Sequence, residues 1–161
     1  NNLNMIVAVN KVDVIGDGGK MLWHIPEELA HFKRTTMHGT LIIGRKTYDT
    51  MKHLLPLEGR DVVVLTGSVS ELEHVAVLND ASDVLKMIEG NPDTTYWLAG
   101  GAAMYEIFFP FCSTAVISIV DNHMKGDTSL SNFSSTYADE KFMVESITTF
   151  NLFTTYVLRM I

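Results

Sequence analysis

Short apolar runs recur along this chain and alternate with stretches of helical periodicity. The runs with almost no polar residue cover positions 5–9, 41–43, 62–65, 96–99 and 116–120. Such runs predict strands that are buried on both faces of a largely parallel sheet. Helical patterns occupy about 26–37, 46–52, 81–89 and 102–109. The alternation predicts one α/β domain over residues 1–161, with right-handed crossovers.

The carboxyl-terminal part of the chain follows a different pattern. Strand-like stretches at 142–148 and 153–160 are joined around Phe150 and Asn151. Two strands this close together predict an antiparallel hairpin, which would make the sheet mixed.

The longest region without clear periodicity covers residues 10–24 and contains Gly16, Gly18 and Gly19. Long glycine-containing loops in compact domains are often functional, so we expect a lid over a binding site. The alternative is an ordinary surface loop.

Charge and composition exclude several classes of partner. The net charge is −7 and the basic residues are scattered, apart from the pairs Lys33-Arg34 and Arg45-Lys46. The sequence therefore lacks the basic footprint of a nucleic-acid-binding protein. The two pairs could still bind a small anion, because a phosphate or carboxylate needs only one or two donors.

Cysteine usage and hydropathy indicate a cytoplasmic protein. Cys112 is the single cysteine of the chain, which excludes an internal disulfide, and no Cys/His cluster suggests a metal site. No apolar run reaches the roughly 20 residues that a membrane-spanning helix needs. The first residues also lack the charged and apolar regions of a signal peptide.

Two adjacent acids open the helix predicted at 26–37, and helical phase separates them. Ile25, Leu29, Phe32 and Thr36 would form a buried stripe with Glu28 at its margin, whereas Glu27 would lie with His31 and Arg34 on the polar side. A partly desolvated carboxylate can bind a planar ligand that offers two parallel N–H donors. Burial should also raise its pKa. The competing interpretation is two solvated acids at a helix start.

Two strand ends run into glycine and then into a helix. Gly100-Gly101 follows one predicted strand, and Gly44 follows another and precedes Arg45, Lys46 and Thr47. Glycine at such a turn lets backbone N–H groups approach a phosphate. Each motif alone is equally consistent with a tight turn or with solvated cations. Together they suggest a dinucleotide at the carboxyl edge of the sheet.

Seven short motifs occur in a characteristic order. They are VIG at 14–16, WHIPEEL at 23–29, FKRTT at 32–36, IGRKTY at 43–48, GR at 59–60, AGG at 99–101 and GDT at 126–128. In order and spacing, the chain resembles the bacterial-type dihydrofolate reductase family over nearly its whole length. The resemblance implies a central eight-stranded mixed, mostly parallel sheet with flanking helices.

The resemblance also implies an activity, which is the NADPH-dependent reduction of 7,8-dihydrofolate to 5,6,7,8-tetrahydrofolate. Hydride would go to C6 of the substrate, and water would carry the proton to N5. The product would support one-carbon and thymidylate metabolism. Members of this family are targets of antifolate inhibitors, and we expect a monomer.

The family pattern assigns roles to residues of this chain. Glu28 would bind the pterin ring, while Trp23 and the hydroxyl of Ser118 would order water beside it. The expected substrate-binding residues are Ile6, Val7, Leu29, Phe32, Lys33, Met51, Leu57, Arg60 and Ala99, with Arg60 holding the carboxylate of the glutamate tail. The expected cofactor-binding residues are Ala8, Ile15, Gly16, Met21, Gly44, Arg45, Lys46, Thr47, Leu65, Thr66, Gly67, Gly100, Gly101, Ala102, Ala103, Met104, Tyr105 and Thr128.

The resemblance also extends to backbone features. It implies a cis peptide between Gly100 and Gly101, a mobile loop at 10–24 that closes over the nicotinamide, and a bracing loop at Gly126-Asp127.

Some positions depart from the family pattern. Leu22 stands where the family commonly has proline before Trp23. Gly67 replaces a hydroxyl often used at the ribose phosphate, and Ala103 replaces a residue that is often basic. Residues 52–57 form a longer stretch than usual. The preference for NADPH would therefore depend mainly on Arg45 and Lys46.

Two alternatives to dihydrofolate reduction are open to a chain with this pattern. One is a reductase of the same fold that acts on a pyrimidine intermediate of flavin synthesis, which would need neither the Trp23 to Glu28 run nor Arg60. The other is a non-catalytic nucleotide-binding module. Retention of Glu28, Trp23 and the glycine pair together argues against it.

Leu22→Pro should restrain the loop before Trp23. Because proline removes backbone freedom, we expect diaminopyrimidine inhibitors to bind about twofold to fivefold more tightly, with a smaller change for the substrate. Inhibition and Michaelis constants of the two proteins would be compared. Equal shifts in both constants would refute the idea.

Overall fold

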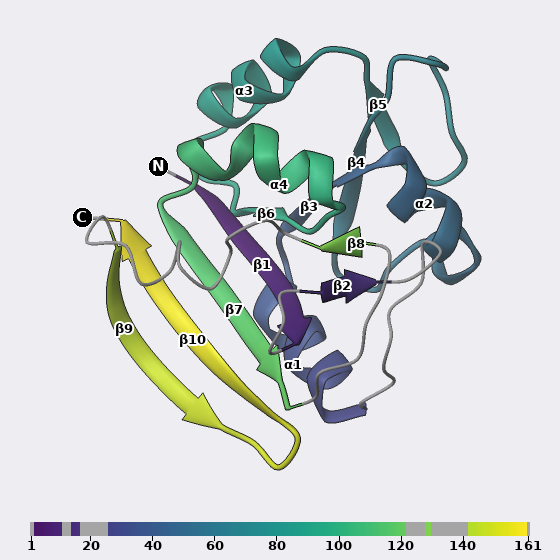
Figure 1. Cartoon of the computed structure of the whole chain (residues 1–161). Coiled ribbons are helices and arrows are strands. Elements are labelled where there is room, and N and C mark those ends of the chain that lie inside the picture. Colours follow the sequence, from purple (N-terminus) through teal and green to yellow (C-terminus); the bar gives the residue numbers. More distant parts are fainter. Residues whose placement is uncertain (1, 11–13, 17–25, 122–127, 130–141, 161) are drawn as a thin grey trace.

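The computed structural model describes residues 2–10, 14–16, 26–121, 128–129 and 142–160 (Figure 1). Its helices are α1 (Pro26–Thr36), α2 (Arg45–Met51), α3 (Ala81–Gly90) and α4 (Ala102–Phe108), with short 3-10 turns η1 (Lys52–Leu54) and η2 (Phe109–Phe111). Its strands are β1 (Leu3–Asn10), β2 (Val14–Gly16), β3 (Thr40–Gly44), β4 (Asp61–Leu65), β5 (Ala76–Leu78), β6 (Tyr96–Leu98), β7 (Thr114–Val120), β8 (Thr128–Ser129), β9 (Phe142–Thr149) and β10 (Phe153–Met160).

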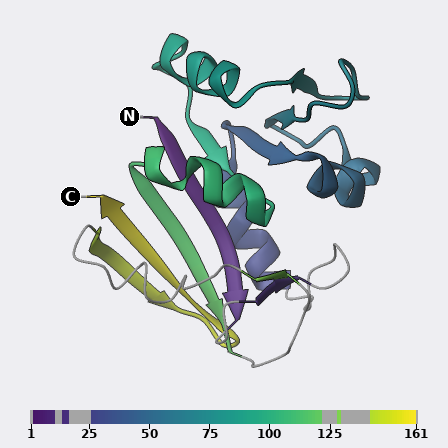
Figure 2. The ribbon, with the colours of Figure 1, turned by 45° about the horizontal axis from the view of Figure 1, so that its top comes forward.

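Eight of these strands form one sheet in the order β5-β4-β3-β6-β1-β7-β10-β9. The strands from β5 to β7 pair in parallel, whereas β10 runs antiparallel to both β7 and β9. Figure 2 shows the β9–β10 hairpin at one edge of the sheet and β4 with β5 toward the other. The predicted mixed, mostly parallel α/β fold with a carboxyl-terminal hairpin is confirmed.

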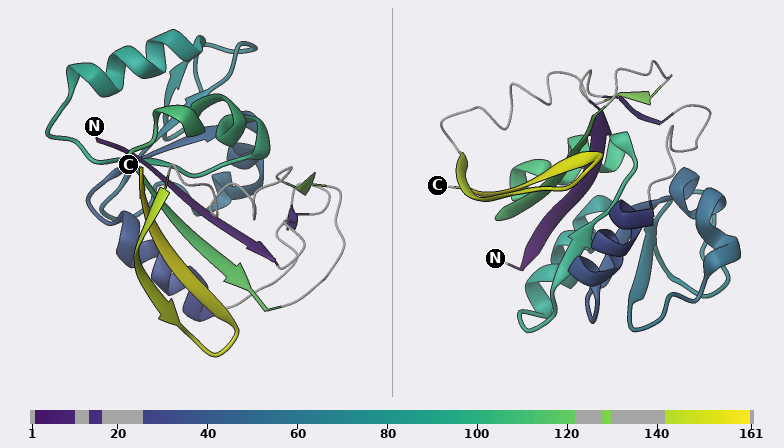
Figure 3. Two further views of the ribbon diagram at one scale, coloured as in Figure 1. Left: turned by 60° about the vertical axis from the view of Figure 1, so that its left-hand side comes forward. Right: turned by 90° about the horizontal axis from the view of Figure 1, so that it is seen from below.

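The central strands are apolar on both sides because helices cover both faces of the sheet. In β3 and β4 the three middle residues are all buried, as expected for parallel strands between two helical layers. By contrast, β9 at the edge is exposed along nearly its whole length. Figure 3 shows α3 and α4 on one face and α1 on the other.

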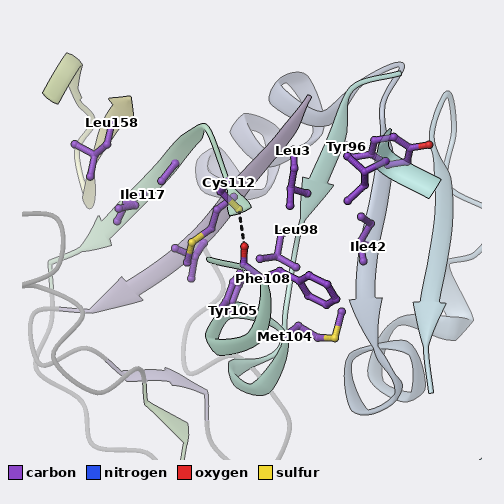
Figure 4. Close-up of a cluster of buried hydrophobic side chains, with 14 of the residues drawn as sticks. Leu3, Ile42, Tyr96, Leu98, Met104, Tyr105, Phe108, Cys112, Ile117 and Leu158 are labelled. Carbon is purple, nitrogen blue, oxygen red and sulfur yellow. Dashed lines mark hydrogen bonds between the residues drawn. The ribbon is translucent and has the colours of Figure 1, made fainter. Parts of the chain in front are cut away.

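The larger core lies under α3 and α4. Met5, Val7, Leu98 and Ile117 project from the sheet toward Phe108 of α4. Figure 4 shows this cluster, together with the hydrogen bond of 3.5 Å that the Cys112 thiol donates to the carbonyl of Phe108. A second cluster on the opposite face contains Leu41, Ile43, Tyr48, Leu55, Val62 and Val64.

Three strands were not expected from the sequence pattern. β5 is only three residues long and joins the sheet beside β4, with polar His74 and Asn79 close on either side. β2 and β8 form a separate two-stranded sheet in which Val14 pairs with Ser129. Pairings this short depend on a partner from elsewhere in the chain, so local periodicity does not predict them.

No helix in the described ranges is both long and apolar enough to cross a membrane.

Phe108→Ala should be strongly destabilising. The ring is 1% exposed in the centre of the core under α4, so truncation leaves a cavity and costs about 3–5 kcal/mol of unfolding free energy. Ile107→Ala is the matched control on the same helix. Its side chain is 47% exposed, and we expect a cost of about 1 kcal/mol or less. Urea denaturation would measure both, and similar costs for the two variants would contradict this description of the core.

Candidate functional site

Glu28 lies on the buried face of α1 rather than at its margin. The carboxylate side chain is only 6% exposed, and Thr36 on the same face is fully buried. Leu29, expected in the buried stripe, is 42% exposed, so that part of the prediction was wrong. The face that packs against the sheet contains Glu28, Phe32 and Thr36, which follow one another at a spacing of four residues. Glu27 is exposed, as expected.

Burial raises the pKa of Glu28 above its ordinary value, as the sequence analysis predicted. The negative charge of Glu28 also affects the pKa of Tyr105 in α4. Burial first, and then the charge of Glu28, raises the pKa of Tyr105 well above its usual range. Tyr105 therefore remains a protonated donor, and its hydroxyl donates a hydrogen bond of 2.8 Å to the carbonyl of Ile6 in β1.

His31 was expected on the polar side of α1, and this prediction was wrong. Its ring contacts Phe150 and Phe153, at centroid distances of 6.0 and 6.3 Å. Its Nδ1 is buried and has no hydrogen-bond partner among the described residues. Burial, followed by the charge of Arg34, lowers the pKa of His31. The β9–β10 hairpin covers this side of the helix, which the helical pattern alone could not indicate.

Several expected substrate-binding residues come together on the face of the sheet that α1 covers. Phe32, Met51, Leu57 and Ala99 are partly buried and pack against the cluster on the α1 face. Partly exposed apolar side chains on the same side of the sheet as a buried carboxylate are suited to a planar ligand.

Ile6 and Val7 point to opposite faces of β1. Val7 belongs to the core under α3 and α4, and side chains alternate along a strand. Only the backbone of Val7 is therefore available to a ligand on the α1 face.

Arg60 lies at the end of α1, where the expected tail-binding residues meet. Its Nη1 donates to the hydroxyl of Thr36 at 3.3 Å and its Nε to the carbonyl of Glu58 at 3.3 Å. Burial lowers the pKa of Arg60, and Glu58 opposes this effect. Lys33 forms an ion pair of 3.6 Å with Glu58, and both side chains are exposed, so the pair contributes little stability.

A groove of about 910 Å³ runs from Arg60 along the amino-terminal ends of β3, β4 and β6. Its lining shares Leu57 and Arg60 with the expected substrate site and none of the expected cofactor residues. The groove therefore lies at the tail end of the expected substrate site, away from the glycine turns.

The two glycine turns lie side by side. β3 and β6 are parallel neighbours, and the N–H of Gly44 donates a hydrogen bond of 2.8 Å to the carbonyl of Gly100. Gly44 precedes α2, and Gly101 precedes α4. Two separately predicted anion-binding turns thus form one surface at the carboxyl edge of the sheet, where dinucleotides bind in α/β folds.

Close contacts explain the glycines. A Cβ on Gly44 would lie 3.1 Å from Cγ of Met104, and a Cβ on either Gly100 or Gly101 would lie 3.5 Å from the hydroxyl of Thr47. Gly100 also has a positive φ of 121°, which other residues rarely adopt. The peptide between Gly100 and Gly101 is cis, as the resemblance implied. The missing Cβ atoms let the two turns pack this closely, and glycine at a strand-to-helix turn lets backbone N–H groups approach a phosphate, so these residues fit a dinucleotide cofactor.

Arg45 and Lys46, the two basic residues expected to bind the cofactor, differ in exposure. Arg45 is half-buried, and its Nε donates to Asp49 at 3.1 Å, whereas Lys46 is exposed. Asp49 was not identified from the sequence. Its carboxylate holds the guanidinium of Arg45 at the first turn of α2 and would compete with a phosphate for it.

Thr66 and Gly67 extend the same edge. Leu65, the last residue of β4, pairs with Gly44, which places Thr66 beside the turn that carries Arg45. The hydroxyls of Thr66 and Ser68 are 3.0 Å apart. Ser68 was not identified from the sequence. Gly67 has no hydroxyl, and Ser68 supplies one at the next position.

The remaining expected residues of α4 differ in exposure. Met104 is buried, Ala102 is half-buried and Ala103 is exposed on the first turn of the helix. In the part of the chain that the structure describes, no group of three His, Cys, Asp or Glu side chains is placed to hold a metal ion.

Ser118 lies in a row of three paired residues across β1, β7 and β10. It pairs with Ala8 on one side and with Thr155 on the other. The hydroxyls of Ser118 and Thr155 are 3.0 Å apart and both side chains are buried. Thr155 was also missed from the sequence, because only the pairing of β10 with β7 brings it to the site.

Some expected positions lie outside the described residues or are described by their backbone alone. Trp23, Met21, Leu22 and the Gly126-Asp127 pair lie outside the described residues. For Ile15, Gly16 and Thr128 only the backbone is described. Gly16 pairs with Thr128 between β2 and β8, so the backbone at 14–16 does contact the segment that follows Gly126-Asp127.

Comparisons with known proteins agree with the fold and with the family that the sequence resembles. The sequence profile of the family described as dihydrofolate reductase matches residues 2–151. Dihydrofolate reductase type 9 of Escherichia coli is 33% identical, covering 80% of this chain and 76% of its own length. Dihydrofolate reductase of Lactococcus lactis is 32% identical, and the match covers 88% of this chain and 83% of that protein.

A solved structure shares the fold. Dihydrofolate reductase from Enterococcus faecalis, complexed with NADP(H) and RAB-propyl, superposes with a TM-score of 0.84 over 98% of this chain and 95% of that chain. The two sequences are 23% identical.

Glu28→Gln should raise the free energy of unfolding at neutral pH. Burial raises the pKa of Glu28 in the folded chain, so between the unfolded and folded pKa values the folded chain binds more protons. Stability therefore falls as pH rises through this window, and a neutral glutamine avoids that loss.

Urea denaturation at neutral pH and at the ordinary pKa of glutamate would measure the difference between Glu28→Gln and the parent, which should shrink at the lower pH. Glu27→Gln, on the exposed side of the same helical turn, controls for charge at the helix start. The same stability difference at both pH values would argue against a desolvated Glu28.

Proposed function

Because this chain belongs to the dihydrofolate reductase family, we propose that it reduces 7,8-dihydrofolate to 5,6,7,8-tetrahydrofolate with NADPH. The observation that carries the proposal is a buried carboxylate, Glu28, on the same molecule as the joined glycine turns. The first feature suits a pterin and the second a dinucleotide.

Glu28 would anchor the substrate. A buried carboxylate satisfies both of its oxygens when it accepts two parallel N–H donors, such as the 2-amino group and N3 of a pterin. Phe32, Met51 and Ala99 would pack against the pterin ring and against the part of the substrate that follows the ring. Arg60, held by Thr36 and Glu58, would bind the carboxylate of the glutamate tail, with Lys33 nearby.

The glycine turns would hold the cofactor. The turn at Gly100 and Gly101 would approach the pyrophosphate with the hydroxyl of Thr47 beside it, and the hydrogen bond from Gly44 to Gly100 would hold the two turns together. Arg45, Lys46, Thr66 and Ser68 lie at the edge expected for the phosphate on the adenosine ribose. When bound, NADPH would supply the hydride that reduces C6 of the substrate.

The protein's own contribution is positioning and electrostatics. Tyr105, fixed on the carbonyl of Ile6, would lie beside the nicotinamide, and Ala8 would face it from β1. Glu28 would act through its charge, which raises the basicity of the bound pterin, while water carries the proton to N5. Trp23 and Ser118 would order that water.

We further propose that the protein works as a monomer in the cytoplasm, binds neither nucleic acid nor membrane, and is inhibited by antifolates that compete with the pterin for Glu28. Its product would enter one-carbon and thymidylate metabolism. The family membership and the fold support these proposals.

Glu28→Gln should keep the fold but lose turnover at neutral pH by on the order of a hundredfold or more. Activity should recover partly as pH falls, because the substrate can then bind already protonated. The measurement is the oxidation of NADPH, followed by absorbance, with dihydrofolate present and absent. Glu27→Gln should match the parent protein. An unchanged rate in Glu28→Gln would remove this residue from the mechanism.

A further inference from the structure

Two buried hydroxyls face one another beneath α1. The oxygens of Ser118 and Thr155 are 3.0 Å apart, and their side chains are 2% and 4% exposed. Their strands have neighbours on both sides, so the backbone groups around them are used in sheet pairing. Each hydroxyl therefore depends on the other for a hydrogen bond within the sheet.

Strand register places this pair on the same face as α1. Phe153 lies two residues before Thr155, and side chains two apart in a strand share a face. The ring of Phe153 contacts His31, which lies less than one helical turn after Glu28 on α1. Figure 1 shows α1 behind the sheet near the ends of β1 and β7. The hydroxyl pair and the buried carboxylate therefore share one side of the sheet.

The position of Glu28 decides which of the two hydroxyls lies nearer to its carboxylate. Glu28 is buried on the sheet-facing side of α1, between His31, whose ring contacts Phe153 of β10, and Phe32, which packs with the apolar cluster of β3 and β4. Glu28 is thus on the β1 side of the row, and β7 lies between β1 and β10. Ser118 is the nearer hydroxyl and Thr155 the farther one. A negative charge orients neighbouring O–H dipoles so that their protons point toward it.

We propose that Thr155 is a positioning residue for the reaction, which donates its proton to the Ser118 oxygen and so leaves the Ser118 proton directed toward Glu28. The proposal rests on the function assigned to Glu28 above. Serine has no γ-methyl group, so its side chain rotates more freely than that of threonine. Thr155 supplies the restraint that the Ser118 side chain lacks.

The alternative is a purely structural pair in which each hydroxyl only satisfies the other. Both descriptions predict some loss of stability when Thr155 is changed, because a buried donor or acceptor then lacks a partner. They differ in the ionisation of the active site, because only a positioning role couples Thr155 to Glu28.

The test uses Thr155→Val, which keeps the shape of the side chain and removes the hydroxyl. With NADPH and dihydrofolate, the midpoint of the pH profile of kcat/KM should move upward by roughly half a pH unit, or about threefold in the ionisation constant. The direction follows because a weaker donor stabilises the carboxylate anion less. Thr155→Ser keeps the hydroxyl and should restore the parent profile.

Thr154→Val is the matched control. It makes the same chemical change on the same strand, at a position that faces away from α1, and should leave the midpoint unchanged. Among the residues that the structure describes, His31 of α1 and Tyr105 of α4 are titratable groups near Glu28. Burial lowers the pKa of His31 and raises that of Glu28, so the shift caused by Thr155→Val should also be measured in a His31→Phe background, where it should persist.

A double-mutant cycle separates direct from indirect coupling. Ser118→Ala should shift the midpoint in the same direction, and adding Thr155→Val to it should produce no further shift. Additive shifts would overturn the proposal, as would an unchanged midpoint in Thr155→Val or a failure of Thr155→Ser to restore it. Unfolding free energies of the same variants show how much of any loss of rate reflects stability, and the midpoints are compared within the pH range in which every variant is fully folded.

Glu28→Gln, measured alongside, distinguishes two failures. If Glu28→Gln changes the pH profile and Thr155→Val does not, the role of Thr155 is wrong and the proposed function stands. If Glu28→Gln leaves the profile unchanged, the role of Glu28 is wrong, and the role of Thr155 fails with it.

Discussion

The insertion of β6 between β1 and β3 is the constraint on which the rest of the site depends. β6 is only three residues long, yet it pairs in parallel with both neighbours. This position brings the turn after β6 next to the turn after β3, so that Gly44 can donate to Gly100. If β6 were not next to β3, at least two strand spacings, or about 10 Å, would separate the turns, and no single phosphate-binding surface would form.

The same insertion positions the substrate side. Ala99 follows β6 and packs with Phe32 of α1 and Met51 of α2 against one apolar cluster, which holds α1 against the sheet. That packing buries Glu28. A buried carboxylate lowers the stability of the folded chain relative to a carboxylate in water. Groups that bind a charged or hydrogen-bonding ligand are often buried in this way. Stability and binding therefore make opposite demands at this residue.

Much of the fold could be predicted from the sequence because hydrophobic period is a local property. The runs at 41–43 and 62–65 lie inside β3 and β4, and the helical patterns begin and end within one residue of the observed helices. Helical phase also separated Glu28 from Glu27 correctly. It failed at Leu29 and His31, because the surfaces that cover a helix come from elsewhere in the chain. The hairpin that covers His31 begins more than a hundred residues later.

The sequence by itself determined the mixed α/β architecture, the glycine turns and the identity of the buried carboxylate, because periodicity, glycine before a helix and helical phase are all written within a few neighbouring residues. Only the tertiary structure decided which side chains meet. It joined Gly44 to Gly100, placed Ser68 beside Thr66, and set Thr155 against Ser118 across two strands. These contacts depend on strand order and on the exact path of each turn, and both are settled by packing of the whole chain.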